Sequence, residues 1–371
     1  MTAPPFTAIA RHEPAMKTLP LYTLTPPREI PRDVALLHAD GKLPNFALMR
    51  LSTYFRERGA NVRLVRPGDR RAAMFGDHPV CFGSSIFDFS TLARARLERE
   101  WAPIHWGGVG VRENSSLNEI DSTVDWDAVR PDYSLYPGYS FSLGYSQRGC
   151  RMSCDFCKVP REEGRARSVA RIDAIWRGDP YPRKIVLLDN DFFGVPEWRD
   201  NIQAIRDGGF EVSFSQGINI RLVDEAAARE LATVKYRDNE FREPVLYTAW
   251  DSLRDEARFI RGVWQLEDAG IPAKNLRVYM VVGFAQGETW DDIQRRYWIM
   301  RNLGCEPYPM VYDNCAHPPG LVANRTLKHF QRWAIRLARS GKIRWDDYDP
   351  HAKAGRTDVG PSLFDDMEEA A

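Results

Sequence analysis

The feature that most limits how this chain can fold is a regular alternation of strand-like and helix-like segments in its second half. From Tyr139 onward, short runs rich in β-branched and aromatic residues alternate with amphipathic stretches. Six such pairs follow one another, and strands separated by helices pair in parallel. The pattern predicts a (β/α) barrel, complete or partial. The expected strands are 141–147, 184–191, 210–218, 245–251, 276–284 and 307–313.

The first part of the chain repeats this alternation on a smaller scale. Strands are expected at 33–39, 61–67, 79–87 and 102–111, and helices at 46–59 and 94–100. The fold class is therefore α/β, with a small Rossmann-like unit ahead of a partial (β/α)6 barrel of the TIM type. The expected division is an extended arm (1–30), the Rossmann-like unit (31–112), a connector (113–138), the barrel (139–320), a helical region (321–350) and an acidic, disordered tail (351–371).

Three of the six cysteines lie within one loop, from Cys150 to Cys157, directly after the first strand of the series. In parallel α/β folds the chemistry gathers at the C-terminal strand ends, so we expect the loop there. The N-terminus lacks a signal-peptide pattern, which indicates a cytoplasmic, reducing compartment that disfavours disulfides. Structural zinc usually takes four ligands, and no fourth cysteine or histidine lies nearby. Thiolates also suit iron–sulfur clusters, and three of them on a [4Fe–4S] cluster leave one iron open.

The spacing of these cysteines resembles a known signature. Cys150-x3-Cys154-x2-Cys157, with Phe156 before the last cysteine, is similar to the motif of the radical SAM superfamily, and the resemblance extends over roughly 139–313. It implies that the three cysteines hold a [4Fe–4S] cluster and that S-adenosylmethionine (SAM) chelates the open iron. One-electron reduction would then release methionine and a 5′-deoxyadenosyl radical. The implied activity is C–H functionalisation or methyl transfer on an unidentified substrate.

The resemblance also suggests where SAM would bind, although it assigns no catalytic residue. Phe156 would lie beside the cofactor, and the residues after the second strand stand where the family has Gly-Gly-Glu, which binds the SAM amino group. Arg221 could bind a carboxylate, or it could simply make polar contacts at the start of a helix. The predicted cofactor-binding residues are Phe156, Asp189, Asn190, Asp191, Gln216, Arg221, Trp250, Asp251, Val282 and Gly283.

The N-terminal unit resembles, in topology, the cobalamin-binding domain found in one group of these enzymes. The Asp-x-His-x-x-Gly loop of that domain is absent, since His38 is followed by Ala39 and Asp40. We therefore expect a cobalamin-binding-like fold that does not bind cobalamin and instead caps the barrel mouth. His38 ends an apolar run, which favours a core or strand-end histidine.

Composition bears mainly on partners. The 51 Lys and Arg residues equal the 51 Asp and Glu residues, so bulk charge gives no sign of a nucleic-acid or membrane partner. No run approaches the ~18 apolar residues of a membrane span. The expected partners are SAM, the substrate and an electron donor such as flavodoxin or ferredoxin. Two alternatives stay open: a non-catalytic zinc or iron–sulfur module, and a nucleic-acid (tRNA) modification or binding protein using the basic helix at 324–340.

Overall fold

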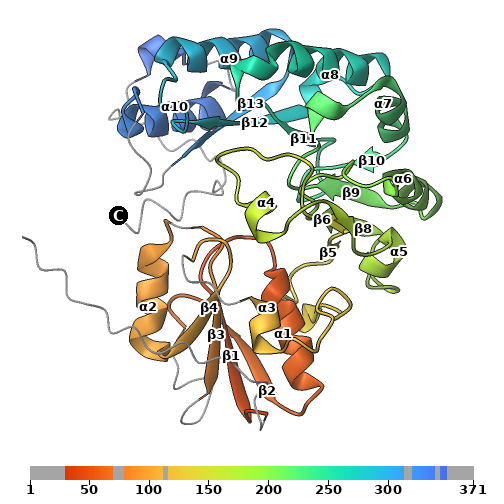
Figure 1. The fold of residues 1–371 in the computed structure, drawn as a ribbon, viewed down its shortest axis with the longest axis vertical. Coiled ribbons are helices and arrows are strands. Elements are labelled where there is room, and N and C mark those ends of the chain that lie inside the picture. Colours follow the sequence, from red (N-terminus) through yellow and green to blue (C-terminus); the bar gives the residue numbers. More distant parts are fainter. Residues whose placement is uncertain are drawn as a thin grey trace, which may run out of the picture.

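The structure is a computed structural model that describes residues 30–69, 79–87, 89–111, 116–312, 320–338 and 343–348. The chain has an α/β fold built on parallel sheets (Figure 1). The predicted arm before residue 30, the acidic tail and Cys315 lie outside the described residues. Within the described part of the chain, no helix has both the length and the apolar composition needed to cross a bilayer.

The N-terminal unit is a four-stranded parallel sheet with the order β2-β1-β3-β4. Residues alternate across it, so Val34 and Leu36 pack beneath α1 on one face, whereas Ala35 and Leu37 pack beneath α2 on the other. The side chain of Asn45 caps α1 by accepting a hydrogen bond from the Leu48 amide. The elements are β1 (Asp33–His38), α1 (Phe46–Arg56), β2 (Asn61–Val65), β3 (Val80–Ser84), α2 (Thr91–Trp101) and β4 (Ile104–Gly107).

His38 lies in the core at the end of β1, as the sequence predicts. Its side chain is 1% exposed, and its Nδ1 lies 3.1 Å from the hydroxyl oxygen of Tyr136. Its Nε2 has no hydrogen-bond partner among the described residues. Burial and, second, the charge of Arg66 lower the pKa of His38 from 6.5 to about 4.

Because His38 is buried in its neutral form, we expect part of the unfolding free energy to be lost in acid. The folded chain keeps His38 neutral while the unfolded chain protonates it, so stability present above pH 6.5 is lost as the pH falls toward about 4. The loss from this group should approach about 3 kcal/mol. We expect His38→Gln to flatten the fall in unfolding free energy between pH 7 and pH 4, measured by urea denaturation. Parallel pH profiles for the two proteins would contradict the prediction.

The second half contains two further parallel sheets, ordered β10-β9-β8-β5 and β11-β12-β13. A single parallel bridge between Ile218 and Thr248 links them. The six strands expected from the sequence are all present, each somewhat shorter than expected. These six strands are β5 (Ser142–Gly144), β8 (Lys184–Leu187), β9 (Glu211–Phe214), β11 (Leu246–Ala249), β12 (Leu276–Val282) and β13 (Glu306–Val311). The two-residue strand β10 (Lys235–Tyr236) was not expected.

Helices follow these strands in the expected order, and Figure 1 shows them on the outer side of the sheets. The expected cap of α9 is a complete capping box between Thr289 and Asp292. The first helix is only one turn long, because the chain is already extended at Trp176. The helices are α5 (Ile172–Ile175), α6 (Trp198–Asp207), α7 (Glu225–Ala232), α8 (Glu256–Asp268), α9 (Trp290–Asn302) and α10 (Asn324–Arg336).

The two halves pack against each other through one hydrophobic cluster. It joins Leu36 and Phe82 of the N-terminal sheet to Trp126 of the connector and to Leu143 and Val186 of β5 and β8. The connector contributes the short helix α3 (Leu117–Ile120) to this region. The cluster explains why the connector packs as an ordered layer rather than as a free linker, although the exact domain boundaries stay a prediction.

Candidate cysteine site at the strand ends

The three cysteines lie in a loop that a short antiparallel ribbon closes at its base. The ribbon consists of β6 (Gln147–Arg148) and β7 (Arg167–Ser168), and the one-turn helix α4 (Val159–Glu162) lies within the loop. At the first cysteine, the Cys150 amide donates to the Gly164 carbonyl oxygen at 3.2 Å. The Cys157 amide donates to the Cys154 carbonyl oxygen at 2.9 Å, which forms a tight turn between these two thiols. All three side chains are half-buried and form no disulfide.

The end of β8 anchors this loop through Asp191, whose side chain is fully buried. Arg151, which follows Cys150, donates from Nε to Asp191 Oδ2 at 2.8 Å and from Nη2 to Oδ1 at 3.0 Å. Its amide adds a third bond at 3.1 Å. A two-point guanidinium–carboxylate pair is a strong and directional contact. The loop is therefore fixed next to its first cysteine.

Asp189 and Asn190 hold the same loop at its base. The Asp189 carboxylate accepts from the amides of Ser146 (2.7 Å) and Gln147 (3.2 Å) and from the Ser146 hydroxyl. Burial outweighs these bonds and raises the pKa of Asp189 to about 7. Asn190 donates to Glu163 at 3.1 Å, and Glu163 also accepts from the Gly149 amide at 2.9 Å. The predicted SAM segment thus uses its side chains to position the cysteine loop.

A positive charge approaches Cys154 from the segment after β9. Arg221 Nη2 lies 3.9 Å from Cys154 Sγ, and Arg221 Nη1 pairs with Asp255 at 3.0 Å. The Arg221 Nε also donates to Asn219 at 3.0 Å, so the guanidinium is held from two sides. A cation in this place stabilises a thiolate. Arg221 lies within a short 3-10 turn, Ile220–Leu222, and makes polar contacts there, whereas its binding of a ligand carboxylate stays a prediction.

Asp251 and its neighbours form an ionic network at the ends of β11 and β12. Asp251 accepts from the Val281 amide at 2.8 Å through Oδ1, and burial raises its pKa. The Arg296 guanidinium, 1% exposed, donates to the carbonyl oxygens of Trp250 (3.1 Å) and Val281 (3.0 Å) and pairs with Glu288. Glu288 in turn accepts from the Gly283 amide at 3.1 Å. This network fixes Asp251 just after β11. From there its charge contributes, after burial, to raising the pKa of Cys157.

The remaining predicted residues differ in what they can contact. The rings of Phe156 and Phe284 lie edge to face, with their centroids 5.7 Å apart. Phe284 follows β12, so the cysteine loop also contacts the end of that strand. Gln216 is exposed beyond β9. Trp250 stacks on Phe259 in the core at 4.6 Å and Val282 is fully buried, so their side chains serve packing.

The residues of the loop suit an iron–sulfur cluster. Burial raises the pKa of Cys150 and of Cys157, so metal binding would have to displace their protons. Among the described residues, no three His, Cys, Asp or Glu side chains converge closely enough to hold one metal ion. A cluster does not need such convergence, because its cysteines bind different irons. Cys150, Cys154 and Cys157 are three half-buried thiols in one loop, so each could bind a different iron of a cluster. The Arg221 guanidinium lies beside one of them, Cys154.

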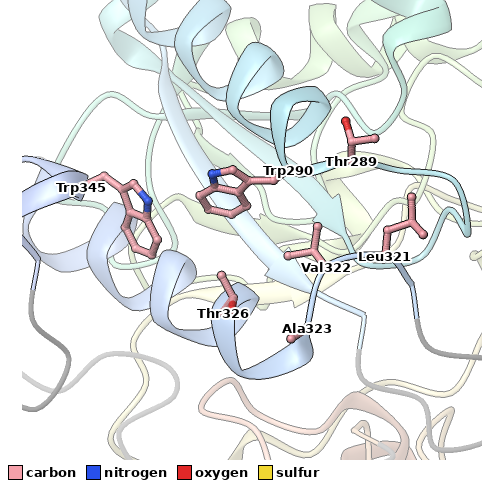
Figure 2. A pocket seen from close by; sticks show the side chains of 7 residues that line it. All are labelled: Thr289, Trp290, Leu321, Val322, Ala323, Thr326 and Trp345. Carbon is pink, nitrogen blue, oxygen red and sulfur yellow. The ribbon is translucent and has the colours of Figure 1, made fainter.

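A pocket of about 430 Å³ at the N-terminal ends of α9 and α10 is not part of this site. Figure 2 shows its walls, which are mostly apolar and include Trp290, Trp345 and Leu321. None of the predicted cofactor or metal residues lines it.

Several residues of the site were missed from the sequence. The sequence assigned no role in the site to four residues that contact the loop or its partners in the structure: Arg151, Glu163, Asp255 and Phe284. An available signal was the presence of Arg151 inside the cysteine motif, because a long cation there can reach a carboxylate at a neighbouring strand end.

Comparison with models of known protein families, with curated proteins and with solved structures finds no match to this chain.

Proposed function

We propose that this chain is a radical SAM enzyme that uses a [4Fe–4S] cluster on Cys150, Cys154 and Cys157. The observation that carries the proposal is the convergence of side chains from successive strand ends on the cysteine loop. Asp191 follows β8, Arg221 follows β9, Asp251 follows β11 and Phe284 follows β12, and each interacts with a residue of that loop. When bound, the cluster and SAM would together supply reductive cleavage of the SAM sulfonium.

The proposed architecture is a partial (β/α)6 barrel behind a Rossmann-like unit. The strand order β5-β8-β9 and β11-β12-β13, with the Ile218–Thr248 bridge between them, supports six parallel strands in series. We propose that the N-terminal unit caps the mouth, because Lys158, next to Cys157, donates to the Val109 carbonyl oxygen after β4 at 2.7 Å. This unit would not require cobalamin, since it lacks the expected histidine loop.

The chain's own residues would place SAM and exclude water. Arg221, whose Nη2 lies 3.9 Å from Cys154 Sγ, would pair with the SAM carboxylate beside that cysteine. Asp251 commits one oxygen to the Val281 amide, which leaves the other for a ribose hydroxyl. The carboxylates of Asp189 and Asp191 are already engaged, so their segment would reach the SAM amino group through its backbone. We place the enzyme in the cytoplasm with a flavodoxin-like or ferredoxin-like electron donor.

The test is formation of 5′-deoxyadenosine. The chain is purified and reconstituted without oxygen, mixed with SAM and dithionite, and assayed by mass spectrometry beside the Cys150→Ala/Cys154→Ala/Cys157→Ala variant. We expect product from the wild type, at least 100-fold above the variant. A Cys81→Ala/Cys305→Ala variant, which removes two buried thiols outside the loop, controls for general thiol loss. Stoichiometric zinc without iron or sulfide would instead support the structural-metal alternative.

A further inference from the structure

A second cavity, of about 490 Å³, lies between the N-terminal unit and the outer side of the β6–β7 ribbon. None of the residues proposed to bind the cluster or SAM lines it. Its volume falls within the range of small-molecule sites, about 300–1,000 Å³. The cavity lies over β3 and β4 of the N-terminal sheet, on the face against which α1 packs. The cavity is thus a separate feature that the proposed function does not use.

Two arginines face each other across the ribbon at one side of this cavity. Arg148 and Arg167 are paired in the β6–β7 register, an arrangement in which like charges repel. Asp127 of the connector relieves that repulsion, because its carboxylate lies 2.9 Å from Arg167 Nη1 and 3.6 Å from Arg148 Nη1. Arg50 of α1 adds a third guanidinium at 3.2 Å from the same carboxylate. Three cations therefore gather around one aspartate.

The cluster keeps one positive charge in excess. Its second carboxylate is Glu163, which accepts from Arg148 at 2.9 Å, so three guanidiniums share two carboxylates. Two more acids line the cavity, but Glu162 pairs with Arg161, and Asp125 is solvent-exposed. At this part of the wall, an anion would be a third negative partner for the three guanidiniums.

Hydrogen bonding indicates the same class of ligand. The Nε atoms of Arg50 and Arg148 are buried and have no acceptor among the described residues. A buried donor without a partner destabilises a fold, so an acceptor supplied by a ligand would be favourable. Burial lowers the pKa of Arg50, although the neighbouring Asp127 opposes that shift. The side chains of Arg148 and Arg167 are 28% and 51% exposed, so a ligand in the cavity can reach their guanidiniums.

The rest of the wall combines apolar and aromatic side chains with polar ones such as Ser84, His105 and Asn118. We propose that the cavity binds a small molecule with a carboxylate or phosphate group on an apolar, ring-sized body, the anion lying against Arg148 and Arg167. Occupancy would bear on the cysteine loop, because Glu163 joins Arg148 to the Gly149 amide beside Cys150. Binding at this site can be measured without the proposed enzyme activity. The apolar residues are Phe46, Leu51, Phe82, Leu117, Ile120 and Trp126.

Calorimetric titration of the full chain tests this site with four probes of similar ring size. Phenyl phosphate and benzoate carry an anion, benzamidine carries a cation, and benzyl alcohol is neutral. We expect saturable binding of at least one anion and at least tenfold weaker binding of the cation and the alcohol. The ranking of the two anions then identifies phosphate or carboxylate as the preferred group. Absence of binding by both anions, or equal binding of the alcohol, would overturn the proposal.

Two variants locate the binding. Arg167→Met removes one half-exposed guanidinium, and Ala47→Phe fills the cavity without changing any charge. Each should weaken anion binding at least tenfold. The matched control is Arg171→Met, an arginine 81% exposed that does not line the cavity, and it should leave binding unchanged. Undiminished affinity in both cavity variants, with folding verified by circular dichroism, would refute the location.

Discussion

Gly149→Ala is expected to disrupt the cysteine loop almost completely. Gly149 precedes Cys150 and has a φ of 81°, a conformation that costs other residues about 1–2 kcal/mol. A Cβ atom there would also lie 2.3 Å from the Arg165 carbonyl oxygen and 2.6 Å from its carbonyl carbon. Both are backbone atoms of the returning side of the loop, so no side chain can move aside. The loop must open or the ribbon must separate.

The measurements are iron and sulfide per reconstituted chain and 5′-deoxyadenosine formed. We expect a fall of at least tenfold in both. Gly164→Ala is the matched control, because Gly164 lies in the same loop with a φ of 77°, but a Cβ atom added there would meet no described atom within 4 Å. It should cost only the backbone strain, about 1–2 kcal/mol, and retain most of the cluster. Equal behaviour of the two variants would show that the close approach at Gly149 is unimportant.

Arg296→Met should give the largest loss of global stability. The Arg296 side chain is 1% exposed and its partner Glu288 is 10% exposed. Removing the guanidinium leaves a buried carboxylate without its cation and two carbonyl oxygens, of Trp250 and Val281, without their donor. Breaking a buried pair in this way typically costs about 3–5 kcal/mol. Chemical denaturation measures it as a lower midpoint with an unchanged slope.

Neighbouring residues provide the controls for this experiment. Arg295→Met removes an exposed cation of the same helix that pairs with Glu256, and we expect no measurable change. The double variant Arg296→Met/Glu288→Gln should recover part of the loss, because no unpaired charge stays buried. If the double variant were as unstable as the sum of its two single variants, the lost carbonyl contacts rather than the stranded charge would be the cause.

The strands and helices could be predicted from the sequence because their signals are local. The apolar run at 184–191 predicts β8, and Thr289 with Asp292 predicts the start of α9. The sequence around the one-turn helix α5 does not reveal where the backbone becomes extended, so the end of this helix could not be predicted. Strand pairing across the Ile218–Thr248 bridge depends on contacts between distant segments, which periodicity does not contain.

The site was predictable in its position but less so in its individual roles. Cysteine spacing and the rule that chemistry lies at strand ends placed Cys150 and Asp191 in one region, and they lie close enough to interact electrostatically. The partner of Asp191 was not predictable, because a carboxylate at a strand end can bind either a ligand or a neighbouring arginine such as Arg151. Trp250 shows the same limit, since an aromatic residue before Asp251 can face a cofactor or the core.

The anchoring of the cysteine loop has a consequence for how such a protein would be assembled. The contacts that hold the loop run through Asp191, Asp189 and Glu163, and none of these bonds uses a thiol. The polypeptide can therefore reach its final shape before any inorganic component arrives. In the proposed enzyme, folding and cluster insertion would therefore be separate events, with the cluster added to a site that the chain has already formed.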